Sequence, residues 1–144
     1  MTSRDEWEQV IHMVVNIFEA QGFVYHIDAS SSLFVHGIDF DMDDLDITVK
    51  WGTIEQAHKV FTFYNPTELT EEYPPSFKFF VNGHEVHILS YESESGIGED
   101  QDRVRVKIGD ILVWSKTVDF YEKHMMINHP LKNLVKSYSR KASL

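Results

Sequence analysis

The stretch that decides the fold is IDASSSLFVHGIDFDMDDLDI, residues 27–47. At the start of this stretch an apolar run ends at Asp28, and small residues follow. Apolar residues then recur at the spacing that is typical of a helix. This change of spacing predicts a strand, a small-residue turn and a short helix over residues 29–35. Its last part opens a second apolar run, which predicts another strand over residues 45–51.

Two aspartates, Asp44 and Asp46, flank Leu45 at the start of the second strand. Side chains alternate along a strand, so both carboxylates project from the same face, with Cα atoms ~6.5–7 Å apart. Such a pair can hold a hard cation, and Mg²⁺ keeps coordination positions open for phosphate oxygens. The spacing therefore indicates a Mg²⁺ site for phosphoryl transfer.

These aspartates belong to an acidic segment, residues 39–46, with five carboxylates in eight residues. A solvated acidic turn before the strand is an alternative interpretation of the same residues. A calcium loop is excluded, because Asp44 stands where the sharp turn needs glycine and Lys50 where the bidentate glutamate belongs. The acidic turn and the Mg²⁺ site both remain open from composition alone.

Two serines, Ser30 and Ser31, lie at the start of the predicted short helix. Backbone N–H groups at a helix start bind phosphate, and small side chains let a phosphate approach closely. A serine in this place is also a common helix N-cap. Phosphate binding and capping are therefore alternative roles for this turn.

The rest of the chain contains further helix and strand patterns. Helices are expected over residues 5–20, 54–63, 117–126 and 131–138, and strands over residues 23–27, 77–81, 85–90, 104–108 and 111–114. Ser3 and Glu6 are expected to form a capping box for the first helix. The order of elements predicts an α/β (α+β) fold, a small mixed β-sheet with helices packed on it, in a single domain over residues 1–144.

The composition removes several classes of protein. The chain has 144 residues, 13 Lys and Arg against 23 Asp and Glu, a formal net charge of −10, and no cysteine. Disulfides and thiolate zinc sites are therefore excluded, and the negative charge argues against nucleic acid as a partner. No stretch approaches the ~20 apolar residues of a membrane span, and no export signal is visible. We expect a cytoplasmic protein with no membrane partner.

The combination of these motifs resembles the nucleotidyltransferase superfamily, especially its small bacterial and antitoxin-type members. That family pattern is Gly-[Gly/Ser], a short helix, Asp-h-[Asp/Glu]-h with h apolar, and a third acid on a neighbouring strand. Ala29 and Ser30 occupy the positions of the first motif, and residues 44–47 match the second. Residues 86–89, Val-His-Ile-Leu, resemble the segment that carries the third acid.

The resemblance implies a nucleotidyltransferase-like fold and the transfer of a nucleoside monophosphate from a nucleoside triphosphate to a hydroxyl acceptor. It implies that Asp44 and Asp46 hold Mg²⁺, and that Ser30, Ser31 and the N–H groups after them bind the triphosphate. A third group then polarises the acceptor hydroxyl. Glu85 and His87 share one face of the predicted strand, so either is a candidate, as a carboxylate or as a neutral base or ligand.

Several residues depart from the family pattern and favour an alternative function. Ala29 replaces a glycine and adds a methyl group where phosphate comes closest, and His87 stands in the third-acid position. Residues 41–43 stand where many small relatives carry an arginine and a hydroxyl residue. The alternative is a catalytically degenerate nucleotidyltransferase-fold protein that binds or regulates a protein partner, as antitoxin-type relatives do. A protein partner or a homodimer that completes the cleft is a further expectation.

Overall fold

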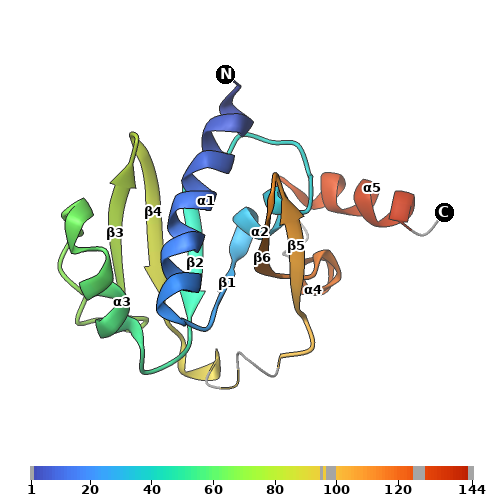
Figure 1. Ribbon diagram of the computed structural model, residues 1–144. Coiled ribbons are helices and arrows are strands. Elements are labelled where there is room, and N and C mark those ends of the chain that lie inside the picture. Colours follow the sequence, from blue (N-terminus) through green and yellow to red (C-terminus); the bar gives the residue numbers. More distant parts are fainter. Residues whose placement is uncertain (1, 95, 97–99, 125–128, 143–144) are drawn as a thin grey trace.

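The computed structural model describes residues 2–94, 96, 100–124 and 129–142. The helices are α1 (Ser3–Gln21), α2 (Ala29–Val35), α3 (Ile54–Val60), α4 (Val118–His124) and α5 (Lys132–Ala142), with short 3₁₀ turns at Thr62–Tyr64 and Glu92–Glu94. The strands are β1 (Tyr25–Ile27), β2 (Leu45–Val49), β3 (Ser76–Val81), β4 (His84–Leu89), β5 (Arg103–Ile108) and β6 (Ile111–Lys116). Figure 1 shows these elements in space.

The described strands form a six-stranded mixed sheet in the order β3-β4-β2-β1-β6-β5. Strand β2 runs parallel to β4 and antiparallel to β1, and β1 runs parallel to β6. The hairpins β3–β4 and β5–β6 complete the two sides of the sheet (Figure 1). The predicted α/β fold with a small mixed sheet is therefore confirmed.

The core lies between α1 and one face of the sheet, and Figure 1 shows α1 crossing in front of the central strands. The buried side chains of α1 are Trp7, Val10, Ile11, Val14, Val15 and Phe18. In β2, Leu45, Ile47 and Val49 are fully buried and belong to the same cluster. Because side chains alternate along a strand, Asp46 and Thr48 project from the other face of the sheet.

The ends of α1 differ slightly from the sequence prediction. Thr2 is the N-cap, and it forms a capping box with Asp5, with both hydrogen bonds at 3.1 Å. The predicted box of Ser3 and Glu6 is therefore wrong by one residue, because the extended backbone of Thr2 already presents a hydroxyl to the first turn. The helix ends at Gly22, which has a left-handed φ of 75°.

The other predicted elements occur with shifted ends. Helix α2 has the predicted bounds, whereas the helix predicted over residues 54–63 divides into α3 and a 3₁₀ turn. The helix predicted over residues 117–126 appears as α4, and residues 125–126 lie outside the described residues. Within the described part of the chain, no helix has both the length and the apolar character needed to cross a membrane.

A second, smaller apolar cluster joins α2 to the carboxyl-terminal helices. Its buried members are Leu33, Ile38, Val118 and Val135, and partly buried Phe40, Tyr121, Leu131 and Tyr138 pack against it. This cluster places α4 beside the start of α2. A segment more than 80 residues away in the sequence therefore forms part of the surroundings of the small-residue turn.

We expect Ile47→Ala to lower the free energy of unfolding by about 2–5 kcal/mol, because it removes a fully buried side chain from the central strand. Its neighbours across the sheet are Ile27 in β1 and Ile88 in β4. Urea unfolding followed by circular dichroism measures this loss. The matched control is Leu112→Ala, which shortens a side chain that is 54% exposed and should change stability by about 0.5 kcal/mol or less. Equal losses in the two variants would contradict the assigned core.

Candidate functional site

Three side chains, Asp44, Asp46 and His87, converge on the polar face of the sheet. One carboxylate oxygen of each aspartate and one ring nitrogen of His87 all lie within 4.8 Å of one another. His87 Nδ1 is 3.3 Å from Asp46 Oδ1. Across the described residues, this is the one group of three or more histidine and acidic side chains whose ligand atoms meet in this way.

The register of β2 and β4 produces this convergence. In the parallel ladder Asp46 is the Cα partner of His87, so the two side chains lie next to each other on one face. Their neighbours in the two strands, Leu45, Ile47, Val86 and Ile88, are fully buried on the other face. Burial of these apolar residues therefore fixes the face from which Asp46 and His87 project.

The start of α2 holds the backbone that carries the two aspartates. The buried Ser31 hydroxyl donates to the carbonyl of Asp44, at 3.2 Å, and accepts the N–H of Asp46, at 3.0 Å. The N–H of Asp28 donates to the carbonyl of Asp46 at 2.9 Å. Ser31 is therefore a positioning residue for the acidic pair, and its predicted contact with a triphosphate stays a prediction.

The site carries an excess of negative charge. Burial raises the pKa of the Asp44 carboxyl, and the nearby carboxylates of Asp46 and Glu85 raise it further, whereas His87 lowers it. Carboxylate oxygens and an imidazole nitrogen are ordinary ligands of divalent cations, and a cation relieves this repulsion. The donor set therefore fits a divalent metal ion.

Glu85, the other candidate for the third group, lies outside this set of ligand atoms. It is two residues before His87 and on the same face of β4. Its carboxylate is 3.8 Å from the ammonium group of Lys78 on β3. Its charge acts on Asp44, but the structure brings His87, rather than Glu85, into contact with Asp46. The catalytic role of Glu85 stays a prediction.

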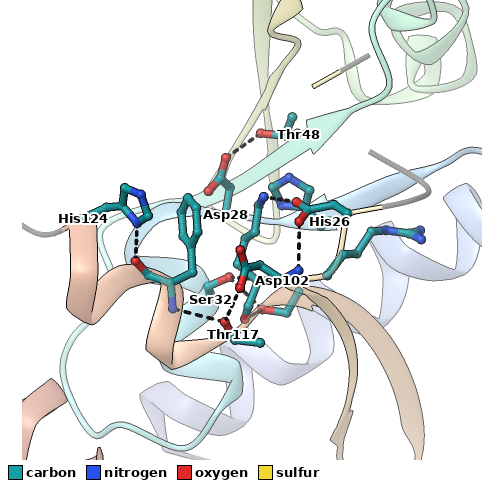
Figure 2. Close-up of polar contacts among 12 residues, drawn as sticks. His26, Asp28, Ser32, Thr48, Asp102, Thr117 and His124 are labelled. Carbon is teal, nitrogen blue, oxygen red and sulfur yellow. Dashed lines mark hydrogen bonds and ion pairs between the residues drawn. The ribbon is translucent and has the colours of Figure 1, made fainter. Parts of the chain in front are cut away.

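Next to the Asp44, Asp46 and His87 group, Asp28 is the centre of a partly buried hydrogen-bond network. Its carboxylate accepts the Thr48 hydroxyl at 2.7 Å, as Figure 2 shows, and also the Tyr121 hydroxyl and the N–H of Ala29. Burial raises the pKa of Asp28, but His26 and these hydrogen bonds outweigh burial and hold it below its ordinary value. Burial raises the pKa of the Tyr121 hydroxyl, and the neighbouring Asp28 carboxylate raises it further.

This network was not predicted from the sequence. Tyr121 accepts the N–H of Ala29 at 2.8 Å across 92 positions of the chain, and no local motif marks such a partner. Asp28 had a visible signal, since it is an acidic residue at the N-cap of α2 followed by small residues. The polar character of Thr48 on the Asp46 face of β2 was a second signal.

A pocket of about 290 Å³ opens beside the small-residue turn. Its lining residues are Ala29, Ser30, Leu33, Phe120, Tyr121, His124 and His129. The rings of Phe120 and His124 stack with centroids 4.3 Å apart, and His124 Nδ1 donates to the carbonyl of Phe120 at 2.7 Å. The two histidines, His124 and His129, therefore line one pocket with Ser30.

The pocket wall formed by α4 is held at its start by Thr117. The Thr117 hydroxyl accepts the N–H of Phe120 at 3.1 Å and lies 3.4 Å from the carboxylate of Asp102, as Figure 2 shows. The ammonium group of Lys116 lies 4.6 Å from the centre of the Phe120 ring and pairs with Asp100. These contacts fix the position of the aromatic side of the pocket.

Comparison with known proteins identifies the fold. No protein-family model and no curated protein sequence matches the chain. A Thermotoga maritima protein proposed to be a nucleotidyltransferase superposes with a TM-score of 0.70 and 12% identity, covering 96% of this chain and 92% of that chain. The crystal structure of ANT(2'')-Ia with adenylyl-2''-tobramycin gives a TM-score of 0.65 and 11% identity, covering 96% of this chain and 93% of that chain.

A solution structure of the same antibiotic-resistance factor, ANT(2'')-Ia, gives a TM-score of 0.61 and 11% identity, covering 94% of this chain and 82% of that chain. These similarities extend over nearly the whole chain. The chain therefore has the nucleotidyltransferase fold. The fold expected from the motifs at residues 29–30 and 44–47 is confirmed.

We expect Asp44→Asn to raise the melting temperature of the metal-free protein at neutral pH. The pKa of Asp44 is higher in the folded chain than in the unfolded chain, so ionisation of Asp44 lowers stability as the pH rises above the unfolded value. The variant has no ionisable group at this position, so it does not lose stability in this way. Its higher melting temperature relative to the wild type should disappear toward about pH 3, where Asp44 is protonated in both the folded and the unfolded chain. Differential scanning calorimetry against pH measures the difference.

The matched control for this charge change is Asp41→Asn, which removes an exposed carboxylate from the same acidic segment. We expect little change in its melting temperature at any pH. An Asp44→Asn variant no more stable than the wild type at neutral pH would contradict the assigned repulsion.

We expect Ala29→Gly to stabilise the protein by about 0.5–1 kcal/mol. Ala29 has a φ of 51°, in the left-handed region, which costs a residue with a Cβ roughly 1–2 kcal/mol. The greater chain entropy of glycine in the unfolded state offsets about 0.5–1 kcal/mol of that gain. Ala20→Gly, at an exposed helical position of α1, should have the opposite sign. Urea unfolding of both variants measures the two effects, and destabilisation by Ala29→Gly would contradict the strained turn.

Proposed function

We propose that this chain, which has the nucleotidyltransferase fold, transfers a nucleoside monophosphate from a nucleoside triphosphate to a hydroxyl acceptor. The observation that carries the proposal is the convergence of Asp44, Asp46 and His87 within 4.8 Å, beside the small-residue turn at Ser30. The crystal structure of ANT(2'')-Ia contains adenylyl-2''-tobramycin, an adenylylated antibiotic, on a similar fold. That similarity supports a reaction of the same class here.

In this proposal Asp44 and Asp46 hold a divalent cation, with His87 as the third ligand. The resemblance to the family implies Mg²⁺, which also accompanies the triphosphate in solution. When bound, a divalent cation supplies neutralisation of phosphate charge and polarises the phosphate oxygens. Ser31 keeps the two aspartates in place through its hydrogen bonds to their backbone.

The nucleotide lies in the pocket beside the turn in this proposal. Ser30 and the N–H groups that follow it contact the triphosphate, and the pocket of about 290 Å³ receives the nucleoside. The stacked rings of Phe120 and His124 offer a flat surface for the base. The Asp28–Tyr121 hydrogen bond holds α4 against the turn and so fixes one wall of the pocket.

The reaction in this proposal is an in-line displacement at the α-phosphorus. A bond forms between the acceptor hydroxyl oxygen and the α-phosphorus, and the bond from that phosphorus to the oxygen bridging the β-phosphate breaks. Pyrophosphate leaves with the electron pair of the broken bond. The hydroxyl proton passes to the carboxylate of Glu85, which lies on the same face of β4 as His87.

A second candidate function is a fold that binds or regulates a protein partner without catalysis. Two observations favour it. The N–H of Ala29, at the turn where phosphate would bind, already donates to Asp28 and to the Tyr121 hydroxyl. His87 also replaces the carboxylate of the family pattern. In this case the partner, or a second copy of the chain, occupies the polar face of the sheet and no nucleotide binds.

We expect at least one of ATP, GTP, CTP and UTP to raise the melting temperature in the presence of Mg²⁺. A ligand at about 100 times its dissociation constant stabilises the native state by about 2.7 kcal/mol, because it binds only the folded chain. For a chain of this size that is a shift of roughly 5–10 °C. Differential scanning fluorimetry with each nucleotide, with and without the metal, measures the shift.

The variant for this test is Asp44→Asn/Asp46→Asn, which should lose the metal-dependent shift while the protein stays folded. The control is Asp39→Asn/Asp41→Asn, which removes two exposed carboxylates from the same segment and should keep the shift. Absence of a shift with all four nucleotides in the wild type, whether Mg²⁺ or Co²⁺ is the metal, would favour the second candidate function and reject the first.

A further inference from the structure

The third ligand position of the site carries an imidazole instead of a carboxylate. We propose that Asp44, Asp46 and His87 bind a first-row transition-metal dication of the Fe²⁺ to Zn²⁺ series in preference to Mg²⁺. This inference rests on the proposed function, because it concerns the same metal site. It specifies the class of ion that this site selects.

The position of His87 in the ligand set is fixed by the sheet. His87 lies on β4, which is paired on one side with β2 and on the other with β3. Its Nδ1 atom is 3.3 Å from Asp46 Oδ1, and both side chains are largely buried, with 20% and 17% exposed. A metal ion that contacts both aspartates therefore also contacts a ring nitrogen of His87. The ring can move away only by changing its rotamer, which the packed neighbouring strands oppose.

The chemistry of the donor atoms then determines which metal ion the site binds most tightly. Mg²⁺ requires near-ideal octahedral coordination by oxygen, whereas imidazole nitrogen suits zinc, iron, nickel and copper. Replacing a third carboxylate by neutral imidazole also reduces the negative charge of the ligand set from three to two. The attraction for a hard dication falls, and the affinity for a transition metal is retained by the nitrogen ligand.

No other carboxylate among the described residues restores a third oxygen ligand in this set. The nearest candidate is Glu85, whose charge acts on Asp44 but whose carboxylate is drawn toward Lys78 at 3.8 Å. Asp43 also adds charge to the surroundings of Asp44, yet it is exposed and lies outside the group of converging atoms. The nitrogen of His87 is therefore the distinguishing ligand.

Isothermal titration calorimetry of the full chain with MgCl₂, MnCl₂ and CoCl₂, without nucleotide, tests the proposal. We expect the wild type to bind Co²⁺ at least about tenfold more tightly than Mg²⁺, and to bind Mn²⁺ less tightly than Co²⁺. His87→Asp should bind Mg²⁺ more tightly. The ratio of its affinity for Co²⁺ to its affinity for Mg²⁺ should therefore be at least about fivefold lower than in the wild type. Visible absorption of bound Co²⁺ gives a second readout, since its bands shift when oxygen replaces the imidazole nitrogen.

His87→Asn is a second variant, since it removes the nitrogen ligand without adding a charge beside Asp44 and Asp46. It should lower Co²⁺ affinity without raising Mg²⁺ affinity, and circular dichroism verifies that both variants fold. The matched control is His84→Ala, on the opposite face of β4, where the ring packs against Trp7. This control removes a histidine from the same strand and should leave the Co²⁺ to Mg²⁺ ratio unchanged.

The outcomes separate the two proposals. In one outcome, Asp44→Asn/Asp46→Asn abolishes metal binding, but His87→Asp has the same ratio of Co²⁺ to Mg²⁺ affinity as the wild type. This outcome would overturn the metal preference and leave the proposed function standing. Binding of no metal by the wild type or by His87→Asp would reject the metal site itself. His87 and Asp46 would then form only an ion pair, and both proposals would fail.

Discussion

The parallel pairing of β2 with β4 is the constraint on which the rest of the structure depends. The buried side chains of Leu45, Ile47, Val86 and Ile88 lock its register, because a slip of one residue would turn the apolar set toward solvent and Asp46 toward the core. The hydrophobic effect that stabilises the sheet therefore also sets the positions of Asp46 and His87. Core packing thus sets the face of the sheet from which Asp46 and His87 project, and hydrogen bonds of Ser31 then fix the backbone of the two aspartates.

Hydrogen bonds stabilise the backbone of the candidate site, whereas repulsion between its carboxylates destabilises the folded protein. The hydroxyl of Ser31 and the N–H of Asp28 fix the backbone around Asp44 and Asp46. At the centre, burial and neighbouring carboxylates raise the pKa of Asp44, so its ionised form opposes folding. Such local conflict within an otherwise consistent structure is typical of functional sites. A structural acidic turn would instead direct these carboxylates toward water, as Asp39 and Asp41 are directed here.

The sequence predicted those features that depend on near neighbours or on alternation. Helix α2 and the shared face of Glu85 and His87 follow from local spacing, and the fold follows from the order of elements. The choice between Glu85 and His87 depends on the register of β2 against β4, which spacing within one strand does not reveal. The role of Tyr121 depends on packing of α4 against α2, so the sequence contains no local sign of it.

The two departures from the family pattern have different physical consequences. Ala29 keeps the left-handed φ that glycine adopts easily, so the turn retains its shape at a cost in strain. His87 changes the chemistry of the site, because it replaces a charged oxygen ligand by a neutral nitrogen while leaving its position in the sheet unchanged. A metal site is lost when its ligand atoms are removed or no longer lie close together. Here three atoms that could bind a metal still lie within 4.8 Å of one another. The convergence of these three atoms therefore favours the proposed change of metal ion over a loss of the site.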